Sequence, residues 1–126
     1  MDVHIHAIPA HEHRYPTVGD WWQDDTGAWH IRVTRQDDWR HEFLIALHEQ
    51  IEMALCAHRG IDEQWVTAFD VHFESARTHG QVEGEPGDAP AAPYTREHRF
   101  AENIERLVAH ELDVVWANYE ATIENS

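Results

Sequence analysis

The spacing of apolar residues predicts two helices in the middle of the chain. From about Asp38 an apolar residue recurs every fourth position, as the buried face of an amphipathic helix requires: Phe43, Leu47, Ile51 and Leu55. Gly60 is a natural end for this helix, and Asp62 can cap a second one. The same four-residue period then continues through Trp65, Phe69 and Phe73.

The first 37 residues follow a shorter period that is typical of strands. The stretch "VHIHAI" (3–8) alternates apolar and polar residues, which predicts a half-buried strand with His4 and His6 facing solvent. Residues 19–34 carry two aromatic or β-branched runs on either side of "DDTG", which predicts a hairpin.

The last third of the chain returns to helical spacing after a loop. Residues 79–93 hold three glycines and three prolines, which favours an irregular loop. A third helix is predicted from about Thr95 to Leu112, and a short fourth helix has one apolar face, formed by Trp116, Tyr119 and Ile123.

This order of elements predicts an α+β fold in a single domain of residues 1–126. Residues 1–37 would form a small antiparallel sheet, a strand plus the hairpin. Residues 38–126 would form three or four helices, with the loop at 79–93.

Composition narrows the possible functions. The 24 acidic residues and nine arginines, with no lysine, give a net charge of −15. This charge repels phosphates, so we expect no direct binding to DNA or RNA, whereas mimicry of nucleic acid remains open. The absence of lysine excludes Schiff-base chemistry and a P-loop.

The cysteine count and hydropathy suggest a location. The single cysteine, Cys56, cannot form an internal disulfide, which suits a reducing cytoplasm. Neither a signal peptide nor an apolar run near twenty residues is visible, so we expect no membrane association. The oligomeric state is left open.

The strongest candidate site is the stretch "HEQIE" in the first predicted helix. His48 and Glu52 lie one turn apart beside the apolar row, and Asp70 and Glu74 repeat this layout on the second helix. The short connection "HRGID" favours antiparallel packing of the two helices, which would bring the four side chains together. Such a cluster at the edge of a core needs a metal or other partners. The alternative is a solvated, salt-bridged helix edge with Arg59 or Arg77 as partners.

"HEQIE" followed by Asp70 and Glu74 resembles the gluzincin branch of zinc metallopeptidases. The resemblance implies a minimal zincin-like fold that binds one divalent transition metal through His48, Glu52 and Asp70. It further implies that Glu49 is the general base and that Glu74 lies behind the third ligand. Glu52 replaces a histidine of the family motif, and this more oxygen-rich ligand set moves the preference from zinc toward manganese or iron, with zinc still the first expectation.

The resemblance also gives a role to the start of the third helix. Zincins use a downstream tyrosine or histidine to stabilise the oxyanion, so His98 is a candidate catalytic residue and Tyr94 a weaker one. His98 is alternatively a further ligand. The implied function is a metal-dependent hydrolase that acts on peptide or amide bonds of a peptide or protein partner.

Over its whole length the chain is similar to small proteins of bacteriophages and prophages, in stretches such as "DWRHEFLIALHEQIE" and "PGDAPAAPYTREH". This similarity implies the cytoplasm of a bacterial host. Three other functions stay open: metal binding without turnover, an acidic interaction protein (a DNA mimic or phage regulatory factor), and a nucleotide pyrophosphatase. The last uses an ExxE such as Glu49–Glu52, but its second acidic pair fails at Thr67.

Overall fold

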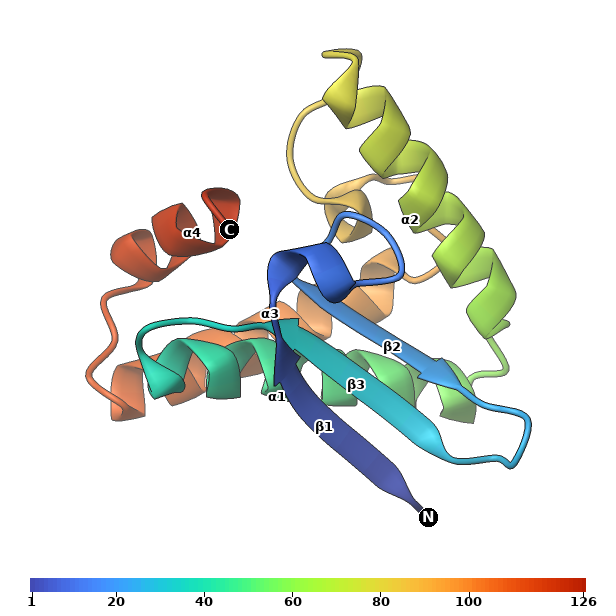
Figure 1. Ribbon diagram of the computed structural model, residues 1–126, viewed down its shortest axis with the longest axis horizontal. Helices are drawn as coiled ribbons and strands as arrows, with labels where there is room; N and C mark the ends of the chain where they lie inside the picture. Colours follow the sequence, from blue (N-terminus) through green and yellow to red (C-terminus); the bar gives the residue numbers. More distant parts are fainter.

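The computed structural model describes residues 1–126 and places three strands before four α-helices (Figure 1). This confirms the predicted α+β class. The elements are β1 (Val3–Ile8), β2 (Gly19–Gln23), β3 (Trp29–Thr34), α1 (Trp39–His58), α2 (Glu63–Thr78), α3 (Thr95–Glu111) and α4 (Trp116–Glu124), with short 3-10 helices η1 (Ala10–Glu12) and η2 (Pro86–Asp88).

The sheet has the strand order β1-β3-β2 and is mixed. The hairpin β2–β3 is antiparallel, as predicted, and Gly27 in its turn has a φ of 89°. β1 pairs with β3 in parallel, from Val3 opposite Trp29 to Ile8 opposite Thr34, so the prediction of an all-antiparallel sheet is wrong for this pair. The reason is that residues 9–18 carry the chain across the sheet, so β1 pairs with β3 and not with β2, the next strand in the sequence.

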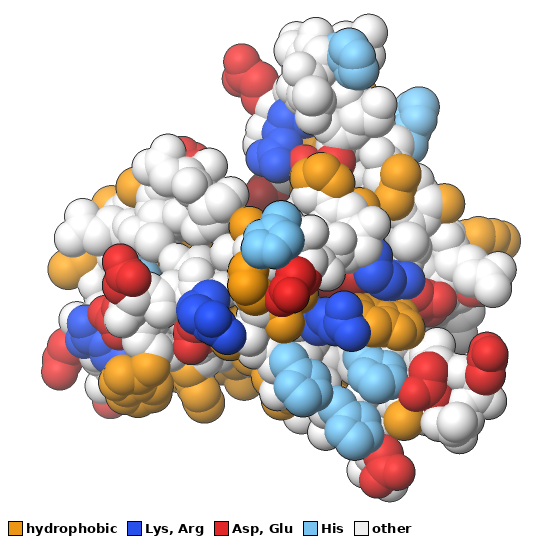
Figure 2. All heavy atoms as spheres, in the orientation of Figure 1, with side chains coloured by type: hydrophobic (Ala, Val, Ile, Leu, Met, Phe, Trp, Pro, Cys, Tyr) orange, Lys and Arg blue, Asp and Glu red, His pale blue; other side chains and the backbone are white.

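One face of the sheet is open to solvent. His4 and His6 are exposed, as predicted, but Ile5 between them is 48% exposed too, so the predicted alternation of buried and exposed positions fails at Ile5. The rings of His4 and His30 stack with centroids 5.4 Å apart, and those of Trp22 and His30 stack at 5.2 Å. Figure 2 shows histidine side chains gathered over this part of the molecule.

The predicted starts of the first two helices and the predicted end of the first are confirmed. The Asp38 side chain accepts a hydrogen bond from the backbone N–H of Arg40, and that of Asp62 accepts one from Gln64, so each aspartate caps a helix. Gly60 ends α1 with a φ of 68°, which favours glycine.

The buried face of α1 is turned from the predicted one. Phe43 is 47% exposed, whereas Leu44, Met53 and Cys56 are fully buried. Neighbouring positions on a helix differ by about 100°, so the row through His48 and Glu52 is the buried face and not its edge. The cause is that α1 lies between the sheet and α3, which runs back along it in the opposite direction (Figure 1).

The expected antiparallel packing of α1 against α2 is wrong. α3 packs most extensively against α1, and α2 packs instead against η2. Figure 1 shows α2 rising away from the layer that α1 and α3 form. A short connection therefore did not decide the packing, because the apolar surface of α1 is already covered by the sheet and by α3. No helix is long and apolar enough to cross a membrane.

Candidate metal centre

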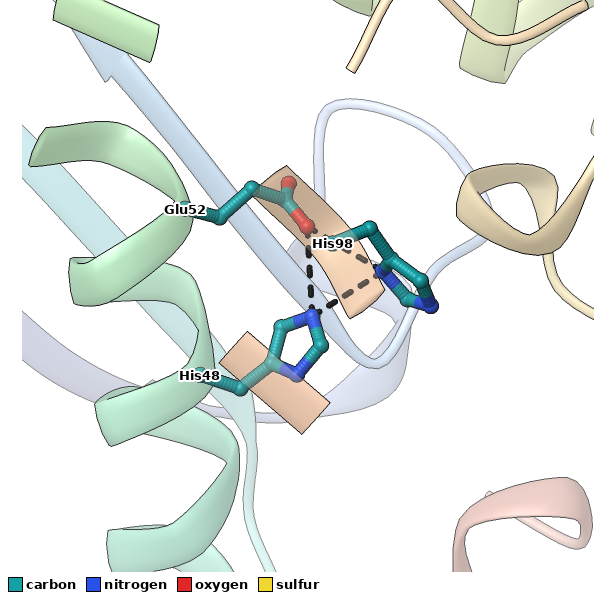
Figure 3. Close-up of side chains that lie close together, drawn as sticks. All are labelled: His48, Glu52 and His98. Atoms are coloured by element: carbon teal, nitrogen blue, oxygen red, sulfur yellow. Dashed lines mark hydrogen bonds and ion pairs between the residues drawn. The ribbon is translucent and has the colours of Figure 1, made fainter. Parts of the chain in front are cut away.

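Three buried side chains from α1 and α3 converge on one point (Figure 3). Nε2 of His48 lies 3.1 Å from Oε2 of Glu52 and 3.1 Å from Nδ1 of His98, and the latter two atoms are 3.2 Å apart. The three residues are 8%, 4% and 5% exposed, respectively. They form a nearly equilateral triangle of one carboxylate oxygen and two imidazole nitrogens.

The size of this triangle fits a metal ion. Ligand atoms bound to tetrahedral zinc at about 2.0–2.1 Å lie about 3.3–3.4 Å from one another. The observed separations are only slightly shorter, so the three atoms could together serve as ligands of one such ion. Because the three residues line a cavity, a further coordination position can stay open to a small molecule.

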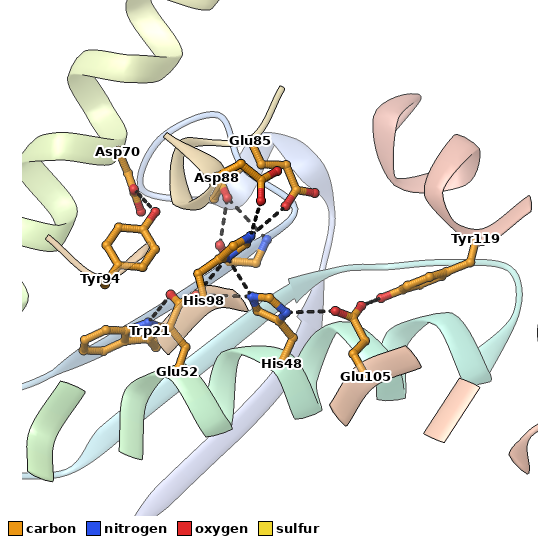
Figure 4. Close-up of polar contacts among 12 residues, drawn as sticks. Trp21, His48, Glu52, Asp70, Glu85, Asp88, Tyr94, His98, Glu105 and Tyr119 are labelled. Atoms are coloured by element: carbon orange, nitrogen blue, oxygen red, sulfur yellow. Dashed lines mark hydrogen bonds and ion pairs between the residues drawn. The ribbon is translucent and has the colours of Figure 1, made fainter. Parts of the chain in front are cut away.

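His48 is held in place by an acid on α3. Its Nδ1 lies 2.8 Å from Oε1 of Glu105, and Tyr119 of α4 donates a hydrogen bond to the other oxygen of Glu105 (Figure 4). An ionised carboxylate only accepts hydrogen bonds, so Nδ1 of His48 donates its proton to Glu105, and Nε2 faces a second carboxylate, that of Glu52. Once Nε2 is deprotonated, its lone pair faces the centre of the triangle.

His98 has the same arrangement with its nitrogens exchanged. Its Nε2 lies 3.2 Å from Oδ1 of Asp88 and 3.5 Å from Oε2 of Glu85, although neither contact has hydrogen-bond geometry. These acids favour a proton on Nε2, which leaves the lone pair of Nδ1 for the centre. Gly87 packs against the ring so closely that a Cβ added there would lie 2.3 Å from Cγ of His98.

Glu52 is oriented by the sheet. The indole N–H of Trp21 on β2 donates a 3.0 Å hydrogen bond to Oε1, which leaves Oε2 for the two histidines. His48 and Glu52 thus each have an outer hydrogen-bond partner that fixes their orientation, whereas His98 has two nearby carboxylates without a hydrogen bond. Histidine metal ligands in proteins are commonly supported by such outer carboxylates.

The titration of the three groups reflects their crowding. Burial opposes protonation of His48, but its hydrogen bonds with Glu105 and Glu52 outweigh burial and raise its pKa well above the ordinary value. Burial likewise opposes protonation of His98, and Glu52 raises its pKa. Burial alone would raise the pKa of Glu52, yet the two histidines hold it at about 2. The site therefore attracts positive charge, which either a proton or a metal ion can supply.

Glu49, the predicted general base, also lines the cavity. Its side chain is half-buried and accepts no hydrogen bond, and it packs on Gly19, where an added Cβ would lie 2.6 Å from Oε1. Burial and the negative charge of Glu52 raise the pKa of Glu49 well above its ordinary value. A carboxyl group of this kind is suited to exchange protons with a molecule in the cavity.

The structure does not bring Asp70 and Glu74 into the triangle. Asp70 accepts hydrogen bonds from Tyr94 and, at 3.0 Å, from Tyr15, and burial raises its pKa to about 7. Glu74 pairs with Arg77 at 2.5 Å. Figure 4 shows Asp70 and Tyr94 set to one side of the histidines. Tyr94 lies near His98, with ring centroids 6.2 Å apart, but its hydroxyl group is engaged by Asp70.

Sequence reasoning found His48, Glu52 and His98 but assigned the last mainly a catalytic role. It missed Glu105, Trp21 and Asp88 altogether. A signal for Glu105 was present, because His98 and Glu105 are seven residues apart and therefore share a face of α3. No pattern in the sequence indicated that this face would meet α1.

The centre lies in a cavity of about 1150 Å³. Its walls come from the segment 10–19, the middle of α1, one side of α2, the loop 80–88, α3 and α4. Figure 2 shows the surface hollowed between α4 and the segment that carries η1. A space of this size accommodates several residues of a peptide or a comparable small molecule.

We found no match to this chain among protein-family models, curated proteins or solved structures.

Proposed function

We propose that the protein binds one divalent transition metal through His48, Glu52 and His98 and acts as a zincin-like metal-dependent hydrolase of amide bonds. The observation that carries the proposal is the triangle of three ligand atoms at 3.1–3.2 Å. Two imidazoles and one carboxylate are a donor set of hydrolytic zinc sites, and non-haem iron sites use it too. This ligand set contains His98 in place of Asp70.

The buried position of the donors supports a metal rather than a plain ion pair. The two inner imidazole nitrogens lie 3.1 Å from each other and 3.1–3.2 Å from the same carboxylate oxygen, so at least one shared positive charge, a proton or a metal ion, is needed among them. Each imidazole also has a carboxylate behind it, which leaves the inner nitrogen as the electron-pair donor. No arginine contacts the triangle, so a metal ion has no competitor among the side chains.

The hydrolytic part of the proposal rests on Glu49 and the cavity. A divalent metal supplies Lewis acidity that makes water a nucleophile near neutral pH. Glu49 follows the first ligand in the chain, faces the same cavity and has no other partner. In this role it would take a proton from water and pass it to the leaving amine.

Metal content tests the ligand set. Protein purified without chelators should carry about one transition metal ion per chain. Elemental mass spectrometry measures this metal content. His98→Ala and the milder His98→Gln should lose it, whereas Asp70→Asn should keep it. Metal loss in Asp70→Asn with retention in both His98 variants would restore the ligand set expected from the sequence. Protein without any metal after incubation with zinc, manganese or iron would refute the site.

Glu49→Gln tests catalysis separately. The variant should keep its metal and lose hydrolysis of fluorogenic peptides by about 10²–10⁴-fold, because only the proton-transferring group is removed. A metal-loaded wild type without activity on any amide would favour the alternative, a non-catalytic acidic binding protein. The observation that favours this alternative is the acidic lining of the cavity itself.

A further inference from the structure

The cavity around the centre is lined by many more acids than bases. Two arginines lie in its walls, and each is already paired: Arg14 with Asp20 at 2.8 Å and Arg77 with Glu74 at 2.5 Å. Eleven acidic residues line the same space: Glu49, Glu52, Asp70, Glu74, Glu83, Glu85, Asp88, Glu102, Glu105, Glu120 and Glu124. A divalent ion at the centre would offset only a small part of this charge.

Exposed acids of the cavity lining come from two different parts of the chain, the loop 80–88 and α4. On the side of the loop 80–88, Glu85 and Asp88 are 52% and 53% exposed. On the side of α4, Glu120 is 48% exposed, and its nearest cation is Arg106 at 3.9 Å. Glu124, one turn further along α4, has no ion-pair partner. The cavity therefore has two separate negative walls, the loop 80–88 and α4.

A second observation is the orphaned nitrogen of His98. Its Nε2 is buried without a hydrogen-bond partner and points at Glu85 and Asp88, which it approaches to 3.2–3.5 Å. Glu85 and Asp88 therefore face a buried imidazole nitrogen without forming a hydrogen bond with it, so each keeps its capacity to accept hydrogen bonds from a bound molecule. Apolar surface from Trp116 and Ile123 lies in the same cavity, and it suits the aliphatic stems of arginine and lysine.

We propose that this groove selects a basic peptide, with arginine or lysine side chains on both sides of the bond held at the centre. The proposal rests on the proposed function for the reaction but not for the binding, because the two walls carry their charge with or without a metal. Acidic peptides are rejected because the groove has no uncommitted cation to receive them. A peptide fits better than a small amine, since the exposed acids lie on two separate elements, the loop 80–88 and α4.

The test uses three fluorescein-labelled pentapeptides that are identical except at two positions. Both positions hold arginine in the first peptide, glutamine in the second and glutamate in the third. Fluorescence anisotropy measures the affinity of the protein for each peptide. The arginine peptide should bind most tightly and the glutamate peptide most weakly. The variant Glu120→Gln/Glu124→Gln should weaken binding of the arginine peptide roughly fivefold, because two charges near its side chains are lost. Both residues are exposed, so the fold is unaffected, which circular dichroism verifies.

A matched control separates the groove from the overall charge of −15. Asp25→Asn/Glu111→Gln removes the same two charges from exposed positions outside the groove. It should leave the affinity for the arginine peptide nearly unchanged. An equal loss in both double variants, no binding of any peptide, or no preference among the three would overturn the proposal.

The same titrations on His98→Gln distinguish this proposal from the metal site. If that variant and the wild type both lack metal yet keep the preference for arginine, the proposed function fails and the groove proposal stands. If metal binds but the peptides bind alike, the groove proposal fails alone.

Discussion

Nδ1 of His48 on α1 lies 2.8 Å from Oε1 of Glu105 on α3, and this contact joins the two helices that supply the candidate ligands. The residues are 57 positions apart in the chain. The contact keeps a proton on Nδ1 of His48 and turns Nε2 toward the cavity, where it can bind a metal once it is deprotonated.

Glu105→Gln should lower metal affinity about 10–100-fold, since an outer carboxylate makes the ligating imidazole more basic and holds its ring in place. Competition with a chromophoric chelator measures the change. Glu102→Gln is the control, because Glu102 lines the cavity one turn earlier on α3 without contacting either histidine. Equal effects of the two substitutions would show that only the total charge matters.

Gly87→Ala should impair metal binding without unfolding the chain. The added methyl group would lie 2.3 Å from the ring of His98, so the ring or the η2 backbone must move. Alanine should not strain the backbone at position 87, because Gly87 does not have a positive φ. Ala91→Val, at an exposed position in the same loop, is the control. Full metal content in Gly87→Ala would mean that His98 is not a ligand in its present position.

Metal affinity should rise with pH around neutrality. In the metal-free protein the pKa values of His48 and His98 are raised, chiefly because hydrogen bonds to carboxylates outweigh burial. A metal ion must displace the proton held there, so affinity should increase by about tenfold per pH unit until that proton is lost. Chelator competition at pH 6, 7 and 8 measures the slope. A flat profile would indicate that the imidazoles are not the ligands.

Asp70 should make the metal-free protein less stable as pH rises. Burial raises its pKa from an ordinary value near 3.8 to about 7 in the folded state. The folded chain therefore binds more protons than the unfolded chain between these values, so the contribution of Asp70 is complete below about pH 4 and is lost as pH rises through about 7. Urea denaturation of chelator-treated protein at pH 5 and pH 8 should show a smaller drop in the free energy of unfolding for Asp70→Asn than for the wild type. The same drop in both would assign the pH dependence to other groups.

The sequence by itself determined the elements and their boundaries. Apolar spacing, the capping aspartates at 38 and 62 and the turn glycines are local signals, because a helix or hairpin depends on neighbours within a few residues. It also determined the pair of candidate ligands on α1, since His48 and Glu52 are one turn apart in any helix.

Only the tertiary structure decided which other residues join that pair. Asp70 and His98 both follow "HEQIE" on later helices, and the sequence pattern favoured Asp70 because its helix comes next. His98, and not Asp70, lies beside His48 and Glu52 because α3, and not α2, packs on the side of α1 that the sheet leaves free. Helix packing depends on how whole helix surfaces fit together, and the spacing of apolar residues in a single segment does not determine this fit. The parallel pairing of β1 with β3 was decided in the same way, by the path of residues 9–18 across the sheet.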